Sequence, residues 1–251
     1  MPSIASKNWI YKQYDYQVQS NTVVSPGEAD AAVIRIRSQN DFLAKPEKDR
    51  GIASVVDCND RWVYLDPQRG SMSAVAEAAR NLSSVGAEPI AITNNLNFSS
   101  PDKAVGFWQL SMSCEGITKA CLALNTPVTG GNVSLYNDTK LPNNTVIPIH
   151  PTPVIGMVGL IEDINKICKK SWVKAEDQIW MIGLPLENNI NQDKRISLSA
   201  SSFLEYIHGL KTGRPPEIDL NLEKQVQSFC HQTQHPNQTQ FDPDYSKKMG
   251  S

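Results

Sequence analysis

The chain has 251 residues, of which 40% are hydrophobic and 20% are charged. This length and composition are typical of a globular protein with one large domain, or with one domain and part of a second. Its 24 basic and 26 acidic residues give a formal net charge of −2, which excludes a general electrostatic attraction to nucleic acid or to anionic membranes. Any phosphate that the protein binds must therefore be held by local geometry.

The cysteines and the N-terminus indicate the compartment. Five cysteines are present without CxxC spacing, and Cys114 and Cys121 fall on the apolar face of an expected helix. This pattern favours buried, reduced thiols over a zinc site. The N-terminus lacks a signal-peptide pattern, and no apolar stretch approaches the roughly 18 residues of a membrane span. We expect the cytoplasm, or the interior of an organelle of bacterial origin.

The first part of the chain predicts an arm, two strands and a helix. Residues 1–31 are polar and aromatic and predict a connecting arm that packs against another part of the protein. Alternating residues over 32–37 and the apolar segment 51–57 predict two strands. An Ala-rich helix is expected from Ser73 to Val85, with Gly86 in the position that follows a helix C-terminus.

The middle of the chain predicts a buried strand over 89–93 and then the longest helix, beginning at Pro101 with Ser100 as its N-cap. The apolar residues of this helix recur at spacings of three and four, which predicts one stripe buried in the core. The stripe consists of Phe107, Leu110, Cys114, Ile117, Cys121 and Leu124. Further strands are expected over 154–161 and around 177–183.

The C-terminal part changes in character. Helical patterns lie around 203–210 and 220–229, and the polar residues 231–251 predict a disordered tail. The order of elements predicts an α/β or α+β fold with helices on a mixed sheet, without deciding between parallel and antiparallel pairing.

The run Thr129-Gly130-Gly131-Asn132-Val133-Ser134 is the most informative segment. Two glycines followed by small polar side chains allow backbone amides to approach an anion, which predicts a phosphate and metal cradle, although most glycine pairs are ordinary turns. Elsewhere, Glu77 and Asn81 lie four residues apart and share a helix face. Spacing alone leaves metal ligation and a solvated surface equally open there.

Ordered motifs give the chain a resemblance to the synthetase subunit of phosphoribosylformylglycinamidine synthase, a purine biosynthesis family, over about residues 3–230. The matching stretches are residues 5–24, Asp57-Cys58-Asn59, Tyr64-Leu65-Asp66-Pro67, residues 74–81, Leu96-Asn97-Phe98, residues 130–137, residues 151–163, His208-Gly209-Leu210 and Gly213-Arg214-Pro215-Pro216.

The resemblance implies a domain organisation. It is to the second AIR-synthetase-like (PurM-like) N-terminal domain of the family, here residues 32–165, followed by a partial C-terminal lid domain over 166–230. The family's first half, with its catalytic histidine region, has no counterpart in the match, so no catalytic residue is expected in this chain. A truncated or split gene product is the expectation.

The resemblance also implies an activity. In the family, formylglycinamide ribonucleotide, ATP and glutamine-derived ammonia give formylglycinamidine ribonucleotide, ADP and phosphate. The implied cofactors are ATP and Mg²⁺. The implied partners are the missing first half of the synthetase, the glutaminase subunit (PurQ) and the small subunit (PurS).

Site residues are implied position by position. Gly131 is an expected nucleotide contact, Asn132 a magnesium ligand and Ser134 a substrate contact. Asn94 stands where the family usually has an aspartate that contacts ATP, so weakened nucleotide affinity is expected. Further candidate metal ligands are Asp57, Glu77 and Asn81.

Two histidines are expected to be structural, namely His150 as a packed or surface residue and His208. The alternative reading of the whole chain is a non-catalytic nucleotide-binding or assembly module, or a degenerate fragment.

Overall fold

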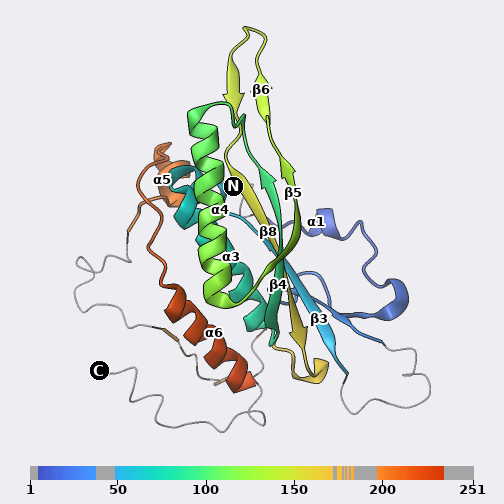
Figure 1. Cartoon of the computed structure of the whole chain (residues 1–251). Helices are drawn as coiled ribbons and strands as arrows, with labels where there is room; N and C mark the ends of the chain where they lie inside the picture. The colour runs from blue at the N-terminus through green and yellow to red at the C-terminus, as the bar shows by residue number, and fades with distance from the viewer. Residues whose placement is uncertain are drawn as a thin grey trace, which may run out of the picture.

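The computed structural model describes residues 5–37, 49–171, 174–176, 178, 180, 182–183 and 197–234. Its centre is a mixed six-stranded sheet in the order β1-β2-β3-β8-β4-β5, with the long helices α3 and α4 over one face (Figure 1). Neighbouring strands are antiparallel except for β4 and β5, which are parallel. The expected α/β layer of helices on a mixed sheet is therefore confirmed.

The strands of the large sheet are β1 (Thr22–Val24), β2 (Ala32–Arg35), β3 (Gly51–Asp57), β4 (Glu88–Asn97), β5 (Val128–Ser134) and β8 (Thr152–Ile161). A separate hairpin consists of β6 (Asp138–Lys140) and β7 (Val146–Pro148). The helices are α1 (Asn8–Tyr11), α2 (Asp60–Leu65), α3 (Pro67–Ser84), α4 (Ala104–Leu124), α5 (Ser202–His208) and α6 (Leu220–Gln234), with short 3₁₀ turns at Val18–Ser20 and Ile164–Lys166.

Helix α3 begins earlier than its Ala-rich sequence predicts, because Asp66 and Pro67 form a strong helix start. The Asp66 side chain accepts a hydrogen bond from the backbone N–H of Arg69 at 3.1 Å, and Pro67 occupies the first helical position. The predicted end is confirmed. Gly86 has φ 91°, and the N–H of Ala87 bonds to the carbonyl of Leu82 in a Schellman motif.

The prediction for helix α4 is wrong at its start and on part of its buried face. The helix begins at Ala104, and the Ser100 hydroxyl accepts a hydrogen bond from the Asp102 N–H in the turn before it. Phe107 is 61% exposed and Cys114 is also exposed, whereas Ile117 and Cys121 are buried as predicted. The remaining buried residues of α4 are small or polar, namely Gly106, Gln109, Ser113, Gly116 and Ala120.

Close packing of α3 against α4 explains this composition. A Cβ added at Gly116 would lie 2.3 Å from the backbone carbonyl oxygen of Gln68 in α3. Only small side chains fit where the two helices approach most closely, and the bulky Phe107 is exposed.

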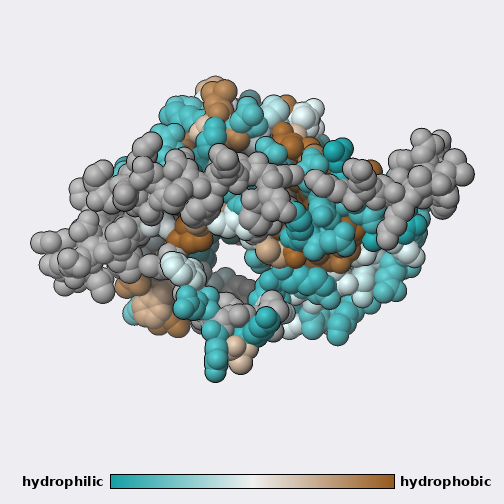
Figure 2. All heavy atoms as spheres, turned by 90° about the horizontal axis from the view of Figure 1, so that it is seen from below, coloured by the Kyte–Doolittle hydropathy of each residue, from teal (hydrophilic) through white to brown (hydrophobic). Residues whose placement is uncertain are grey.

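The two faces of the sheet differ. On the face covered by helices, Ile92, Ile155 and Met157 are buried against α3 residues such as Leu82. On the opposite face Ile34, Ile52, Val56 and Val158 are exposed. We call this second side the open face of the sheet. Seen from below, the surface of the described residues shows hydrophobic patches among hydrophilic residues (Figure 2).

The arm and the C-terminal part both contact the central sheet and its helices. Residues 22–24 of the arm form edge strand β1, which pairs with β2. Helix α6 packs on α3 and α4 and extends to Gln234, so residues 231–234 of the predicted tail are helical; residues 235–251 lie outside the described part.

Of the strand expected around 177–183, the described residues 178, 180, 182 and 183 are not in a strand, and the other residues of this range lie outside the described part. Among the described helices, none is long and apolar enough to cross a bilayer.

Candidate functional site at the edge of the sheet

Parallel pairing of β4 with β5 brings the principal predicted site residues together. The register places Asn94 beside Gly131, Asn95 beside Asn132, and Asn97 beside Ser134. The glycine run is therefore part of an edge strand, and neither Gly130 nor Gly131 has a positive φ. The run is therefore a strand and not a turn, and the residues of the predicted phosphate and metal cradle share one edge of the sheet.

Gly131 and Gly130 differ in the space that is available for a side chain. A Cβ at Gly131 would lie 2.1 Å from Asn94 Oδ1 and 2.5 Å from the Asn94 backbone oxygen, whereas a Cβ at Gly130 would meet nothing within 4 Å. Gly131 is thus required for the close approach of the Asn94 side chain to the β5 backbone.

The predicted contacts lie on two faces of the sheet. Paired residues of parallel strands project to the same side, and successive residues alternate. Asn94 shares the helix-covered face with the buried Ile92 and Leu96, so Gly131 belongs to that face. Asn132 and Ser134 belong to the open face. Because β5 is the outermost strand, a ligand at this edge can reach both faces around it.

On the open face, side-chain amides form a hydrogen-bonded group. Asn132 Nδ2 donates to Asn95 Oδ1 at 3.1 Å, and Asn97 Nδ2 donates to the backbone oxygens of Asn95 at 3.0 Å and Thr152 at 3.3 Å. No residue in the described part donates to Asn132 Oδ1, which leaves this oxygen to a ligand. Sequence reasoning missed Asn95 and Asn97; the signal was the polar run that ends β4.

A second group of predicted residues lies nearer the centre of the sheet. Asn81 of α3 donates its Nδ2 to Asp57 Oδ2 at 3.1 Å. Burial raises the pKa of the Asp57 carboxyl, although Asn81 and Arg80 act in the opposite direction. Burial and then the negative charge of Asp57 raise the pKa of Glu77, which Arg80 again opposes. The three candidate ligands on β3 and α3 are therefore neighbours.

The two groups are separate. Asp57 and Asn94 both pair with Ile155 of β8, one on each side, so two strand spacings of about 4.8 Å lie between them. Among the residues that the structure describes, no three His, Cys, Asp or Glu side chains are grouped to hold a metal. A cation at Asp57 and Glu77 would need the Asn81 amide or ligand oxygens as well.

Comparison with known proteins identifies the family. Residues 28–161 match the model of the AIR synthase related protein, N-terminal domain. The chain belongs to this family.

Members of the family named phosphoribosylformylglycinamidine synthase subunit PurL are very similar to this chain. The protein from Prochlorococcus marinus (strain NATL2A) is 95% identical over 232 residues, which are 92% of this chain and 29% of that protein. The protein of strain MIT 9303 is 59% identical over 228 residues. The chain thus spans less than a third of the length of the curated relatives it matches, and the resemblance drawn from its motifs is confirmed.

Solved structures agree with the family. The structure of PurLQS from Thermotoga maritima matches 66% of this chain and 25% of that chain, with 35% identity and a TM-score of 0.55. The T. maritima PurL complexed with ATP matches the same share of this chain, with 35% identity and a TM-score of 0.53. An AIR-synthetase-like fold is therefore shown for this AIR synthase related chain.

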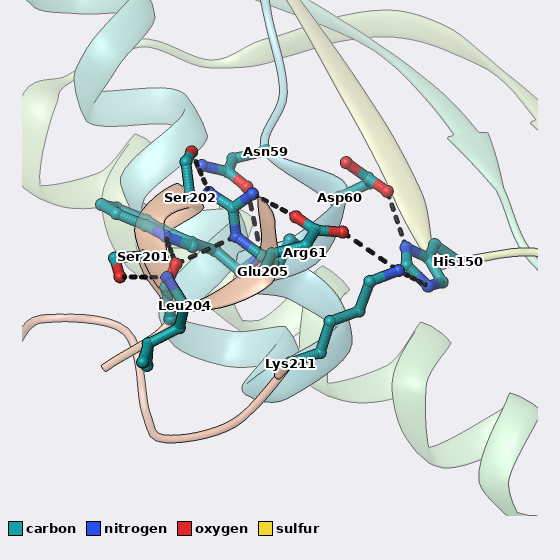
Figure 3. A network of polar contacts seen from close by, with 11 residues as sticks. Asn59, Asp60, Arg61, His150, Ser201, Ser202, Leu204, Glu205 and Lys211 are labelled. Atoms are coloured by element: carbon teal, nitrogen blue, oxygen red, sulfur yellow. Dashed lines mark hydrogen bonds and ion pairs between the residues drawn. The ribbon is translucent and has the colours of Figure 1, made fainter. Parts of the chain in front are cut away.

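A polar network attaches helix α5 to α2 (Figure 3). Arg61 donates to Glu205 Oε2 at 2.6 Å and to the backbone oxygen of Ala200 at 2.9 Å. Lys211 Nζ lies 3.3 Å from Glu205 Oε1 and 3.3 Å from His150 Nε2. Nδ1 of His150 is hydrogen-bonded to Asp60 Oδ2 at 2.7 Å. The network holds α5 against α2, which lies in the domain of residues 28–161 that matches the family.

Both histidines have structural contacts, as expected. His150 stacks on Tyr64 with ring centroids 4.8 Å apart, and His208 meets Phe203 edge-on at 5.1 Å. Among the described residues, ion pairs between α3 and the C-terminal part join Arg69 to Glu217 at 2.5 Å and Arg80 to Glu223 at 2.6 Å.

All five cysteines are free thiols, but only Cys121 is fully buried. Cys114 and Cys168 are exposed, so the prediction of burial is wrong for them. Burial, with the nearby charges of Asp60, Asp57 and Glu77, raises the pKa of Cys58 to about 12. Cys58 therefore stays protonated at neutral pH and is not an activated nucleophile.

Proposed function

We propose that the chain is part of a phosphoribosylformylglycinamidine synthase, an ATP-dependent carbon–nitrogen ligase. Such an enzyme converts formylglycinamide ribonucleotide, ATP and glutamine-derived ammonia to formylglycinamidine ribonucleotide, ADP and phosphate. The observation that carries the proposal is the grouping of Asn94, Gly131, Asn132 and Ser134 at one edge of the sheet by the β4–β5 register. The 95% identity to a PurL subunit supports it.

The chemistry requires oriented donors and cations more than a protein nucleophile. The substrate amide oxygen attacks the γ-phosphorus of ATP and releases ADP, and ammonia then adds to the activated carbon as phosphate leaves. Negative charge on the phosphoryl oxygens is the main obstacle. In this proposal the Gly131 backbone contacts ATP, and the Ser134 hydroxyl donates to a phosphate oxygen of the substrate.

Magnesium fits the residues present at the edge. Asn132 Oδ1 is a hard oxygen donor that no described residue occupies by hydrogen bonding, and Mg²⁺ prefers such oxygens. Bound magnesium would supply positive charge next to the polyphosphate. Asn94 on the other face carries no charge and can accept or donate a hydrogen bond, which suits a nucleotide contact but weakens any attraction to the cation.

The proposal extends to domains, partners and compartment. Residues 32–165 form the N-terminal domain and residues 166–230 part of the lid domain. A polypeptide corresponding to the remainder of the relatives' sequence, a glutaminase subunit (PurQ) and a small subunit (PurS) complete the enzyme, as the name of the T. maritima PurLQS structure suggests. Five free thiols are consistent with a reducing cytoplasm.

Reconstitution tests the proposal. The chain is combined with the remaining PurL portion and the two other subunits, and formylglycinamidine ribonucleotide is measured. We expect activity that Asn132→Leu reduces at least 10-fold, with Asn221→Leu, at an exposed position of α6, as the matched control. Equal activity of the Asn132→Leu and Asn221→Leu proteins would contradict the assigned role of the edge.

The second candidate is a non-catalytic module that holds a nucleotide for structural reasons. The neutral Asn94, where the family usually has aspartate, favours this candidate. Titration of the chain with Mg·ATP and Mg·ADP separates the two. Binding of nucleotide without any activity on reconstitution supports the module, whereas restored activity supports the ligase.

A further inference from the structure

We propose that Asn95 is a positioning residue that sets the orientation of the Asn132 side-chain amide, so that Asn132 Oδ1 is presented to a magnesium–nucleotide ligand. This inference rests on the proposed function and adds a residue that does not itself touch the ligand. Its basis is the hydrogen bond from Asn132 Nδ2 to Asn95 Oδ1 at 3.1 Å.

The first step is that an asparagine can act as a cation ligand in only one of its two orientations. The amide has one oxygen, which can bind a cation, and an NH₂ group, which cannot. Rotation by 180° about the last side-chain torsion exchanges them at little cost in shape. An exposed asparagine without a partner would spend part of its time with the NH₂ group toward the cation.

The second step is that Asn95 supplies the acceptor for the Asn132 NH₂ group in the structure. Asn95 and Asn132 are direct partners in the parallel register and project to the same open face. With Asn95 Oδ1 accepting from Asn132 Nδ2, a reversed Asn132 would place two acceptor oxygens against each other. The hydrogen bond therefore leaves Asn132 Oδ1 facing away from Asn95, available to the ligand.

The third step is that the backbone of Asn95 is held more firmly than the backbone of Asn132. Asn95 lies on β4, which has hydrogen-bonded neighbours on both sides, and pairs with Val154 of β8. Its backbone oxygen also accepts from Asn97 Nδ2 at 3.0 Å. Asn132 lies on edge strand β5, where one side has no neighbouring strand in the described sheet. An interior strand thus carries the acceptor for a side chain of the edge strand.

The test measures Mg·ATP binding to the full chain by calorimetry for four variants. Asn95→Leu removes the acceptor at similar volume and should weaken binding about 3- to 10-fold, the value of one hydrogen bond. Asn95→Asp retains an acceptor that cannot reverse, so binding should equal or exceed that of the parent. Thr93→Asp controls for charge, because Thr93 lies two residues before Asn95 on the same face of β4. The fourth variant, Asn132→Leu, should lose the cation-dependent part of binding.

A spectroscopic readout is independent of nucleotide binding. In ¹H–¹⁵N spectra of the parent, one Nδ2 proton of Asn132 should exchange slowly with solvent, and Asn95→Leu should abolish this protection while Asn95→Asp retains it. An Asn132 signal that does not change in Asn95→Leu would overturn the proposal, as would binding by Asn95→Leu within twofold of the parent. An increase in Mg·ATP affinity in Thr93→Asp equal to that in Asn95→Asp would also overturn it, because charge alone would then explain the effect.

The failure of this inference is distinguishable from failure of the proposed function. If Asn132→Leu binds Mg·ATP as the parent does, the assigned role of Asn132 is lost and the positioning role falls with it. If Asn132→Leu loses binding while Asn95→Leu does not, the proposed function survives and only the role of Asn95 is wrong.

Discussion

Asn94 Oδ1 occupies the space where a side chain at Gly131 would begin, because a Cβ built there lies only 2.1 Å from this oxygen. Gly131→Ala should therefore separate β4 from β5 locally and lower the free energy of unfolding by about 1–3 kcal/mol, or roughly 3–10 °C in Tm. Gly130→Ala is the matched control, since its Cβ meets nothing within 4 Å. Thermal unfolding of both variants checks the prediction, and equal Tm values would contradict it.

The uncharged Asn94 is expected to limit nucleotide affinity. Asn94→Asp changes few atoms and restores the negative charge that is usual at this position in the family, so it should tighten Mg·ATP binding by up to about fivefold, the range of one exposed charge pair. Asn94→Leu should weaken binding. Calorimetric titration at low salt measures both, and an Asn94→Asp protein that binds more weakly than the parent would refute the role of this position.

Asp57 and Glu77 repel each other when both are ionised. Their pKa values are raised, Asp57 by burial and Glu77 by burial and by Asp57. Folding therefore favours the protonated forms: the unfavourable contribution is present above the folded-state pKa values and is relieved as pH falls through them. Glu77→Gln should raise Tm at pH 7 without divalent cations, whereas Glu115→Gln, at an exposed position of α4, should not.

The effect of Mg²⁺ on Tm shows whether Asp57 and Glu77 bind a cation or only repel each other. If the two carboxylates and Asn81 hold a cation, millimolar Mg²⁺ should raise the Tm of the parent and leave Glu77→Gln unchanged. The same shift in both proteins would mean that the cation acts elsewhere, and Asp57, Glu77 and Asn81 would then be excluded as metal ligands.

The contact of α4 with α3 depends on Gly116, whose added Cβ would lie 2.3 Å from the Gln68 carbonyl oxygen. Alanine is the better helix former by about 1 kcal/mol, but contact with a rigid backbone outweighs that gain. Gly116→Ala should therefore destabilise the protein by about 1–3 kcal/mol. Ser111→Ala, at an exposed position of the same helix, is the control. Urea unfolding of the two variants gives the comparison, and a Gly116→Ala protein as stable as the control would show that the helices can separate.

Docking of α5 should depend on pH through Glu205. The hydrogen bond from Arg61, followed by that from Lys211, lowers the pKa of Glu205. A lowered carboxyl pKa contributes stability above the unfolded-state pKa, and this contribution is lost as pH falls through the folded-state value. Glu205→Gln should thus lower Tm at pH 7 and converge with the parent in acid, while Glu176→Gln tracks the parent throughout. A Tm difference that does not change with pH would rule out the ionised pair as its cause.

Local sequence signals predicted several elements well. The Ala-rich pattern and Gly86 gave helix α3 and its end, and Leu220–Phe229 lies within α6, because capping and periodicity act over a few residues. The buried face of α4 was only partly predictable. Phe107 and Cys114 fit the apolar period as well as Ile117 does, and only the close approach of α3 decides that small residues face the core.

The sequence by itself determined the family, the identity of the edge residues Asn94, Gly131, Asn132 and Ser134, and the chemistry that their side chains can perform. Only the tertiary structure decided that the glycines lie in a strand, that Asn94 and Asn132 point to opposite faces, and that Asn95 is the hydrogen-bond partner of Asn132. The physical reason is that side-chain alternation is local, whereas the register between β4 and β5 joins residues 37 positions apart and is fixed by packing of the whole sheet against its helices.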